Sequence, residues 1–257
     1  MKARMNAVKV LLVVAALVAV FTFPTGSGAD NSWGNYHWAR TSNPFTLKVI
    51  DSNTTDWDDN LNDALSDWSR SSVLDLAYEA GSSALKDRKR CAATTGKVRS
   101  CNAAYGFNQW LGLATIYLSG SHITRGTAKM NDSYFNLSGY DETARQHVMC
   151  QEIGHTFGLD HQDESGADLN TCMDYSDELD NPSPNRHDYA QLEIIYEHLD
   201  STTTVGFSAF SSNMFEDPDA PHNWGQLVRQ SANGRSSYYE RDNPDGTKRL
   251  THVFWTE

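Results

Sequence analysis

The stretch "QEIGHTFGLDH", which begins at Gln151, combines residue types and spacing that could bind a metal ion and activate a water molecule. On an α-helix, residues four apart share one face and lie about 6 Å apart along the axis, so Gln151 and His155 can reach one ion. Glu152 is adjacent and can hold a water beside the ion instead of binding it. Gly158 allows a sharp turn that returns His161 to the same ion. Three protein ligands and one water form the open coordination of a catalytic zinc.

This stretch resembles the metzincin signature H-E-x-x-H-x-x-G-x-x-H, with glutamine in place of the first histidine. Metzincins also carry a methionine turn beneath the zinc, and "TCMDYS" supplies Met173 twelve residues after His161. The order of the expected strands and helices is similar as well, and the resemblance covers roughly residues 33–200. In order and size the segment is more like the matrixin branch, although it lacks the "PRCGxPD" cysteine switch.

The resemblance implies a role for each matching residue. It makes Gln151, His155 and His161 the ligands of one catalytic zinc ion, and Glu152 the general base. Tyr175 follows the methionine by two residues. In the astacin and serralysin branches a tyrosine at that place approaches the metal, so Tyr175 is expected to stabilise the oxyanion.

Gln151 is the departure from the pattern, and two residues compete for its role. Its amide oxygen projects from the right place but is a weaker zinc ligand than imidazole. His147 lies eight residues before His155, about 12 Å along a straight helix, so its use as a ligand would strain the site. The remaining histidines have no partner at ligand spacing and are expected to be structural or exposed: His122, His187, His198, His222 and His252.

The elements that must position this site follow from apolar periodicity. Strands are predicted at 45–51, 73–79, 110–120 and "HITRGTAKMN", and the stretch 86–102 is predicted to be a loop. An amphipathic helix carries the stripe from Trp57 to Trp68, and Asp141 is expected to cap the active-site helix. A C-terminal helix is expected at 187–199. The predicted fold is α+β, of the α/β/α-like metzincin type: a twisted mixed sheet with an active-site helix, a methionine turn and a C-terminal helix.

Composition changes after Asp200. Residues 201–223 lack periodicity and are predicted to be a linker. Residues 224–257 hold apolar clusters separated by Asn-Gly and Asp-Gly dipeptides, which favour tight turns. A small β-meander extension is therefore expected there, after a catalytic domain at 30–200.

Four cysteines allow three disulfide pairings. None of their spacings is CxxC, which argues against a cysteine zinc site. We expect Cys91–Cys101 and Cys150–Cys172. The second bond would tie the active-site helix to the methionine turn, because Cys150 precedes Gln151 and Cys172 precedes Met173.

The first 29 residues have the pattern of a signal peptide: basic residues, a 14-residue apolar run and a small-residue cleavage site before Asp30. The apolar run is short for a membrane span, although an uncleaved anchor is the alternative. From Asp30 onward the chain has 18 basic and 33 acidic residues, a net charge of −15. Such a charge disfavours nucleic acid and anionic lipid as partners.

The sequence therefore predicts a secreted zinc metalloendopeptidase, expected to be monomeric, that acts on protein or peptide substrates. A substrate is expected to add as a strand along an exposed sheet edge in 110–120. The alternative is a catalytically inactive, metzincin-shaped secreted binding protein, and a non-peptidase hydrolase is a third hypothesis.

Overall fold

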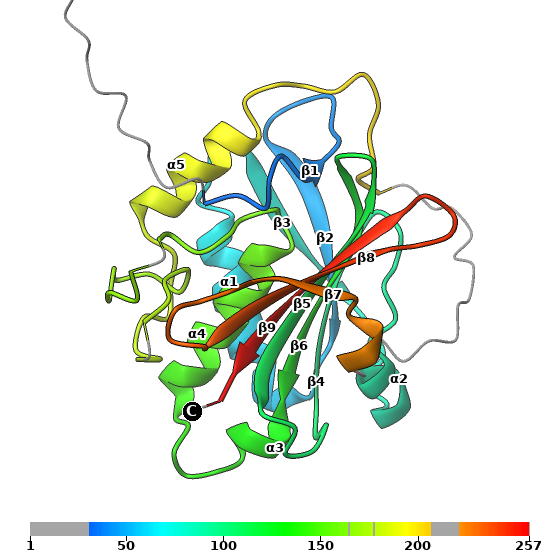
Figure 1. Cartoon of the computed structure of the whole chain (residues 1–257). Helices are drawn as coiled ribbons and strands as arrows, with labels where there is room; N and C mark the ends of the chain where they lie inside the picture. Colours follow the sequence, from blue (N-terminus) through cyan, green and yellow to red (C-terminus); the bar gives the residue numbers. More distant parts are fainter. Residues whose placement is uncertain (1–30, 164, 177, 207–220, 257) are drawn as a thin grey trace, which may run out of the picture.

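The computed structural model describes residues 31–163, 165–176, 178–206 and 221–256. The predicted signal peptide at 1–29 and residues 207–220 of the predicted linker lie outside these ranges. Within them the chain forms one mixed sheet of nine strands and five α-helices (Figure 1). The predicted α+β class and the mixed sheet are therefore confirmed.

The sheet has the strand order β3-β2-β4-β6-β5-β9-β8-β7, and β1 pairs with β6. Neighbours among β1, β2, β3, β4 and β6 are parallel, whereas every pair from β6–β5 to β8–β7 is antiparallel. The strands are β1 (His37–Trp38), β2 (Phe45–Ser52), β3 (Leu74–Ala80), β4 (Val98–Ala103), β5 (Trp110–Ser119), β6 (His122–Asn131), β7 (Gln226–Gln230), β8 (Ser236–Asp242) and β9 (Lys248–Trp255).

Three of the helices lie on one side of the sheet in Figure 1: α1, α4 and α5. The five helices are α1 (Asp58–Trp68), α2 (Leu85–Arg90), α3 (Asp132–Phe135), α4 (Glu142–His155) and α5 (Arg186–Ile195), with 3-10 turns η1 (Thr55–Trp57) and η2 (Pro221–Asn223). Helix α4 packs against α1 and against β5 and β6. Helix α4 thus lies between α1 and the centre of the sheet.

Local sequence explains where the two central helices begin and end. The apolar stripe of α1 is buried from Trp57 to Trp68, as the periodicity predicts. The Asp141 side chain accepts a hydrogen bond from the Ala144 amide at 2.9 Å and caps α4. After α4 the chain turns at Gly158, whose φ of +91° is a left-handed value that glycine adopts without strain.

Two sequence predictions of secondary structure were wrong. The stretch 86–102 is not a loop, because it contains most of α2 and of β4. No residue of α2 is buried, so the sequence carries no apolar stripe from which this short helix could be predicted. The predicted helix at 187–199 ends at Ile195, and Leu199 is exposed instead of lying on the buried face.

The C-terminal strands change the expected position of the substrate edge. Strands β7, β8 and β9 form an antiparallel meander, and β9 pairs with β5 from Trp110↔Trp255 to Leu118↔Lys248. Strand β5 is therefore an interior strand with β6 on its other side, and the prediction that 110–120 presents a free edge was wrong. The sequence could not reveal this pairing, because β5 and β9 are more than a hundred residues apart.

Both expected disulfides are present, Cys91–Cys101 and Cys150–Cys172. The second joins α4 to the loop that holds Met173. Across the described residues, no helix combines the length and the apolar character that crossing a bilayer would require.

Candidate metal centre

His155 and His161 come together at the end of α4, where both are buried. Their ring centroids lie 4.8 Å apart. His155 Nδ1 lies 2.9 Å from the Leu159 carbonyl oxygen, so Nδ1 carries the proton and donates it. His155 Nε2 is buried and has no hydrogen-bond partner. That tautomer leaves a lone pair on Nε2, which is the form in which histidine binds a metal.

The same tautomer follows for His161 from a longer chain of hydrogen bonds. The Tyr238 hydroxyl donates to Asp160 Oδ1 at 2.6 Å, so its oxygen is free to accept from His161 Nδ1, which it contacts. His161 Nε2 is buried without a partner, as His155 Nε2 is. Burial lowers the pKa of His161 to about 3 and holds the pKa of His155 well below its usual value. Both rings are therefore neutral near pH 7.

Gln151 is oriented by the loop that follows the second histidine. Its Nε2 donates to the Cys172 carbonyl oxygen at 2.8 Å. Because a carbonyl requires a donor, the amide nitrogen must face Cys172 and Oε1 must face elsewhere. That Oε1 is buried without a partner. Gln151 thus offers another buried, unpaired acceptor atom on α4, one helical turn before His155, and its role as a ligand stays a prediction.

A third histidine joins the centre from the C-terminal strand. His252 of β9 is fully buried, and its ring centroid lies 4.1 Å from that of His155 and 5.2 Å from that of His161. These three side chains each offer a ligand atom, and the three atoms lie within 4.8 Å of one another. The expectation that His252 has no partner at ligand spacing followed from the sequence alone, whereas in the structure its ring lies beside those of His155 and His161. No local spacing signals this residue, because the β5–β9 pairing alone brings it to α4.

Glu152 forms an ion pair with the third histidine, because its Oε2 lies 3.1 Å from His252 Nδ1. Its other oxygen, Oε1, is buried without a partner. Burial raises the pKa of Glu152, while the neighbouring His252 opposes that shift. A carboxyl whose pKa lies above the usual range is better matched to accept and return a proton near neutral pH.

The loop after His161 forms one wall of the centre. The Tyr175 ring stacks on the His161 ring at 4.0 Å between centroids, which brings it to the edge of the cluster. Met173 is fully buried, and a Cβ added to Gly154 of α4 would lie 2.8 Å from its sulfur. The glycine therefore allows the close approach of α4 to Met173. His147 is also fully buried, but it belongs to neither of the two described groups of converging ligand atoms.

Segments from the two ends of the described chain cover the centre. Asn31 donates to the His161 carbonyl oxygen at 2.5 Å, and the Trp33 ring stacks on His155 at 5.1 Å. Tyr238 of β8 and His252 of β9 also pack around the two rings, and the Tyr238 ring lies 5.6 Å from that of Trp33. Glu152 and His155 are consequently inaccessible to solvent.

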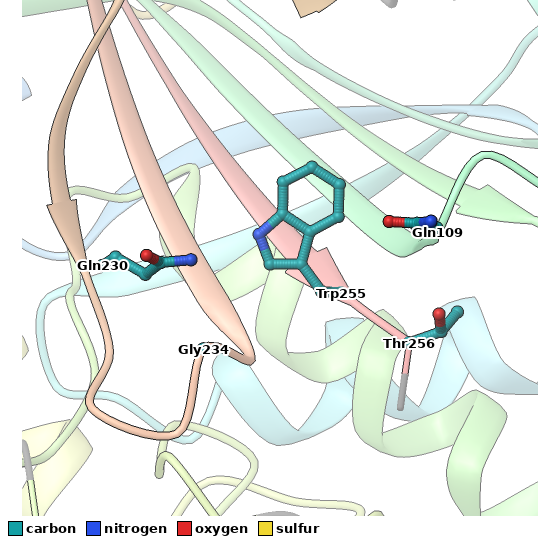
Figure 2. A pocket seen from close by; sticks show the side chains of 5 residues that line it. All are labelled: Gln109, Gln230, Gly234, Trp255 and Thr256. Carbon is teal, nitrogen blue, oxygen red and sulfur yellow. The ribbon is translucent and has the colours of Figure 1, made fainter.

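A separate pocket opens near the C-terminus and is lined by Gln109, Gln230, Gly234, Trp255 and Thr256 (Figure 2). None of these side chains titrates near neutral pH or belongs to the histidine cluster. The pocket therefore offers no group for acid–base or metal chemistry.

Comparison with known proteins adds no identification. No known family model matches the chain, and no curated protein matches it. The assignment of function therefore depends on the geometry of the centre.

Proposed function

We propose that this chain is a secreted zinc-dependent endopeptidase of metzincin type, with one catalytic zinc ion. The observation that carries the proposal is the set of buried acceptor atoms that have no partner: His155 Nε2, His161 Nε2 and Gln151 Oε1. Buried polar atoms are almost always paired, because an unpaired one costs about 1–3 kcal/mol. A cation bound by all three atoms would remove that cost.

The donor set fits zinc. Two neutral imidazoles and an amide oxygen, with the imidazole of His252 nearby, favour zinc over magnesium or calcium, which prefer oxygen ligands alone. The zinc, when bound, would polarise a scissile carbonyl group and lower the pKa of a water molecule. Glu152 would take the proton of the attacking water and deliver it to the leaving amine. Tyr175 would donate a hydrogen bond to the developing oxyanion.

Peptide access requires a different arrangement of β9. That strand pairs with β5 at the place where a substrate was expected to add as a strand. In addition, Nδ1 of its His252 lies 3.1 Å from Glu152 Oε2. We infer that the described form is closed and that cleavage requires β9 to leave β5. The same closure favours the second candidate function, an inactive binding protein, if β9 never leaves.

The test combines metal content with cleavage of casein, with and without a chelator. The wild-type protein should contain zinc, and Glu152→Gln should keep the zinc and lose cleavage by about 10²–10⁴-fold. Thr251→Pro should raise cleavage, because proline removes an N–H group from β9 and weakens its pairing.

Three results would decide against the peptidase. One is the absence of bound zinc after zinc is added, and another is full cleavage by Glu152→Gln. The third is bound zinc without any cleavage, in both the wild type and a folded Thr251→Pro variant, which would favour the binding protein.

The third ligand is tested in the same series. Gln151→His should tighten zinc binding if position 151 faces the ion, because imidazole is the better donor. Gln151→Ala should weaken zinc binding, and His147→Ala should leave it nearly unchanged. His252→Gln tests whether His252 is itself a ligand. If this variant loses as much zinc affinity as His155→Ala does, His252 binds the ion in the closed form.

A further inference from the structure

A second cluster of histidines surrounds Asp200, away from the α4 centre. His37 of β1, His122 at the start of β6 and His198 after α5 all direct Nε2 toward Asp200 Oδ1, at 3.5, 3.2 and 3.8 Å. His37 Nε2 and His198 Nε2 are also 3.2 Å apart. The register of β1 on β6 pairs His37 with His122, so the sheet itself sets two of the four groups side by side.

Four of the six separations within this set are close to the edges of a zinc tetrahedron, and the ligand atoms of His37, His122 and Asp200 all lie within 4.8 Å of one another. For zinc–nitrogen and zinc–oxygen bonds of about 2.0–2.1 Å, ligand atoms at tetrahedral angles lie about 3.3 Å apart. The four separations of 3.2–3.8 Å scatter around that value. Ordinary hydrogen bonds from nitrogen to oxygen would be shorter than two of the three contacts to Asp200.

Hydrogen bonding satisfies most of this arrangement but leaves one unfavourable contact. His37 Nδ1 lies 2.7 Å from the Asn35 carbonyl oxygen, so Nδ1 carries the proton of the neutral ring and Nε2 presents a lone pair. A neutral His198 donates from Nε2 to that lone pair at 3.2 Å, but the lone pair also faces the carboxylate oxygen Asp200 Oδ1 at 3.5 Å. A cation between these atoms would replace that unfavourable contact by coordination.

Arg40 orients Asp200 and His198 through hydrogen bonds, as the outer-shell partners of a metal site do. Asp200 Oδ2 accepts from the Arg40 backbone N–H and from Arg40 Nη1, both at 3.1 Å, which leaves Oδ1 for the histidines. The same guanidinium donates to the His198 carbonyl oxygen. Metal-bound histidine and carboxylate groups characteristically have such second partners, which fix the tautomer and the orientation of the ligand.

We propose that His37, His122, His198 and Asp200 form a second, structural metal site that binds zinc. Four protein ligands leave no open position for water or substrate, which distinguishes a structural site from a catalytic one. The expectation that His122 and His198 have no metal partner followed from sequence spacing alone. The cluster joins three segments that are far apart in the sequence.

The site would brace the α4 centre through the N-terminal segment. From β1, Trp38 Nε1 donates to the Thr156 carbonyl oxygen at 3.0 Å, just beyond α4. The preceding residues Asn31 and Trp33 contact His161 and His155. An ion at His37 would therefore fix the strand from which these contacts extend.

The test is the zinc stoichiometry of the full-length protein, measured by competition with a chromophoric chelator. The wild type should bind two ions. His198→Ala should weaken one of them by at least about 100-fold, because changes to outer-shell partners already cost 10–100-fold. The His198 side chain is half exposed, so this variant should fold. His222→Ala is the matched control, because His222 is exposed and belongs to neither cluster.

The absorption spectrum of bound cobalt tests the coordination at this site independently of cleavage. Cobalt bound at this site should give the visible absorption of a tetrahedral complex, and His122→Asn or His198→Ala should remove that band while His155→Ala retains it. If His155→Ala abolishes the only bound ion and His198→Ala changes nothing, the second site is refuted and the catalytic site stands. If His198→Ala abolishes the only bound ion and His155→Ala changes nothing, the second site stands and the zinc of the proposed peptidase is refuted.

Discussion

Gly112→Ala tests how tightly β5 presses on Glu152. A Cβ at Gly112 would lie 2.4 Å from Glu152 Oε1 and 2.8 Å from Glu152 Cγ and from Val148 Cγ1. Unstrained carbon contacts are about 3.5–4.0 Å, so at least one group must move by about 1 Å. Val148 is fully buried, and both residues belong to α4, so the helix must tilt from the sheet or Glu152 must change position.

The expected cost is that of overpacking a dense core, about 1–3 kcal/mol in the free energy of unfolding. For a protein of this size, each kcal/mol corresponds to about 2–4 °C in Tm. Because the Glu152–His252 contact is 3.1 Å long, a shift of about 1 Å would break it. Because the same shift would move the Glu152 carboxylate away from the place where it would take a proton from water, cleavage should fall toward the level of Glu152→Gln. Zinc affinity should change little, because the partners that orient His155 and His161 lie elsewhere.

Urea denaturation, zinc competition and casein cleavage measure the three effects. Gly139→Ala is the matched control, since a Cβ there meets nothing within 4 Å. Unchanged stability and unchanged cleavage in Gly112→Ala would refute the inferred contact between β5 and Glu152. A large loss of zinc binding with intact folding would show instead that β5 orients the metal ligands.

Three further predictions concern the floor of the site, its disulfide and its buried histidine. Gly154→Ala should lower the free energy of unfolding by about 1 kcal/mol net. Alanine gains about 1 kcal/mol in helix propensity, but its Cβ would lie 2.6 Å from Trp68 and 2.8 Å from the Met173 sulfur, so the overpacking outweighs that gain. A variant that is more stable in thermal unfolding would contradict this. Replacing Cys150 and Cys172 together by alanine should lower the unfolding free energy by roughly 3 kcal/mol, because the bond closes a loop of 22 residues; a change below about 1 kcal/mol in urea denaturation would count against it. Burial lowers the pKa of His147 to about 4 from an unfolded value near 6.5, so the unfolded state binds more protons as pH falls. Stability should therefore decline between about pH 6.5 and pH 4 by about 3 kcal/mol, and a His147→Gln variant with the same pH dependence would rule His147 out as the cause.

The sequence predicted the elements whose signals are local. The stripe of α1, the Asp141 cap and the turn at Gly158 each depend on residues within one or two turns of chain. Both disulfides agree with the expected pairing, and for Cys150–Cys172 the reason is local, because these cysteines directly precede Gln151 and Met173, which the resemblance expects to lie close together.

The missing parts of the site come from pairings between distant segments. His252 reaches α4 only because β9 pairs with β5, and His37 meets His122 only because β1 pairs with β6. Neither pairing leaves a spacing that a single sequence reveals. Amphipathic alternation predicts that a strand exists, but its partner is decided by the packing of the whole sheet.

The burial of β9 sets the energy of opening the site. Three of its apolar side chains, Leu250, Val253 and Phe254, are buried. Full burial of such side chains contributes about 1.5–3 kcal/mol each, so their full exposure would cost about 5–9 kcal/mol. At about 1.4 kcal/mol for each factor of ten, the open form would be at least about 1,000-fold less populated than the closed form.

The low population of the open form limits the rate at which the intact chain could cleave a peptide. The contacts that make the centre dry also strengthen its electrostatic interactions, because charges act more strongly where water is excluded. The same contacts exclude a substrate. Spontaneous opening would limit cleavage by the intact chain to about a thousandth of the open form's rate. Efficient cleavage would therefore need an event that removes β9, such as a cut in the chain before Gln226 or a partner that binds the meander. Limited proteolysis between α5 and β7, followed by the casein assay, should raise cleavage strongly, and an unchanged rate in a chain that has lost β7–β9 would refute this control of the site by β9.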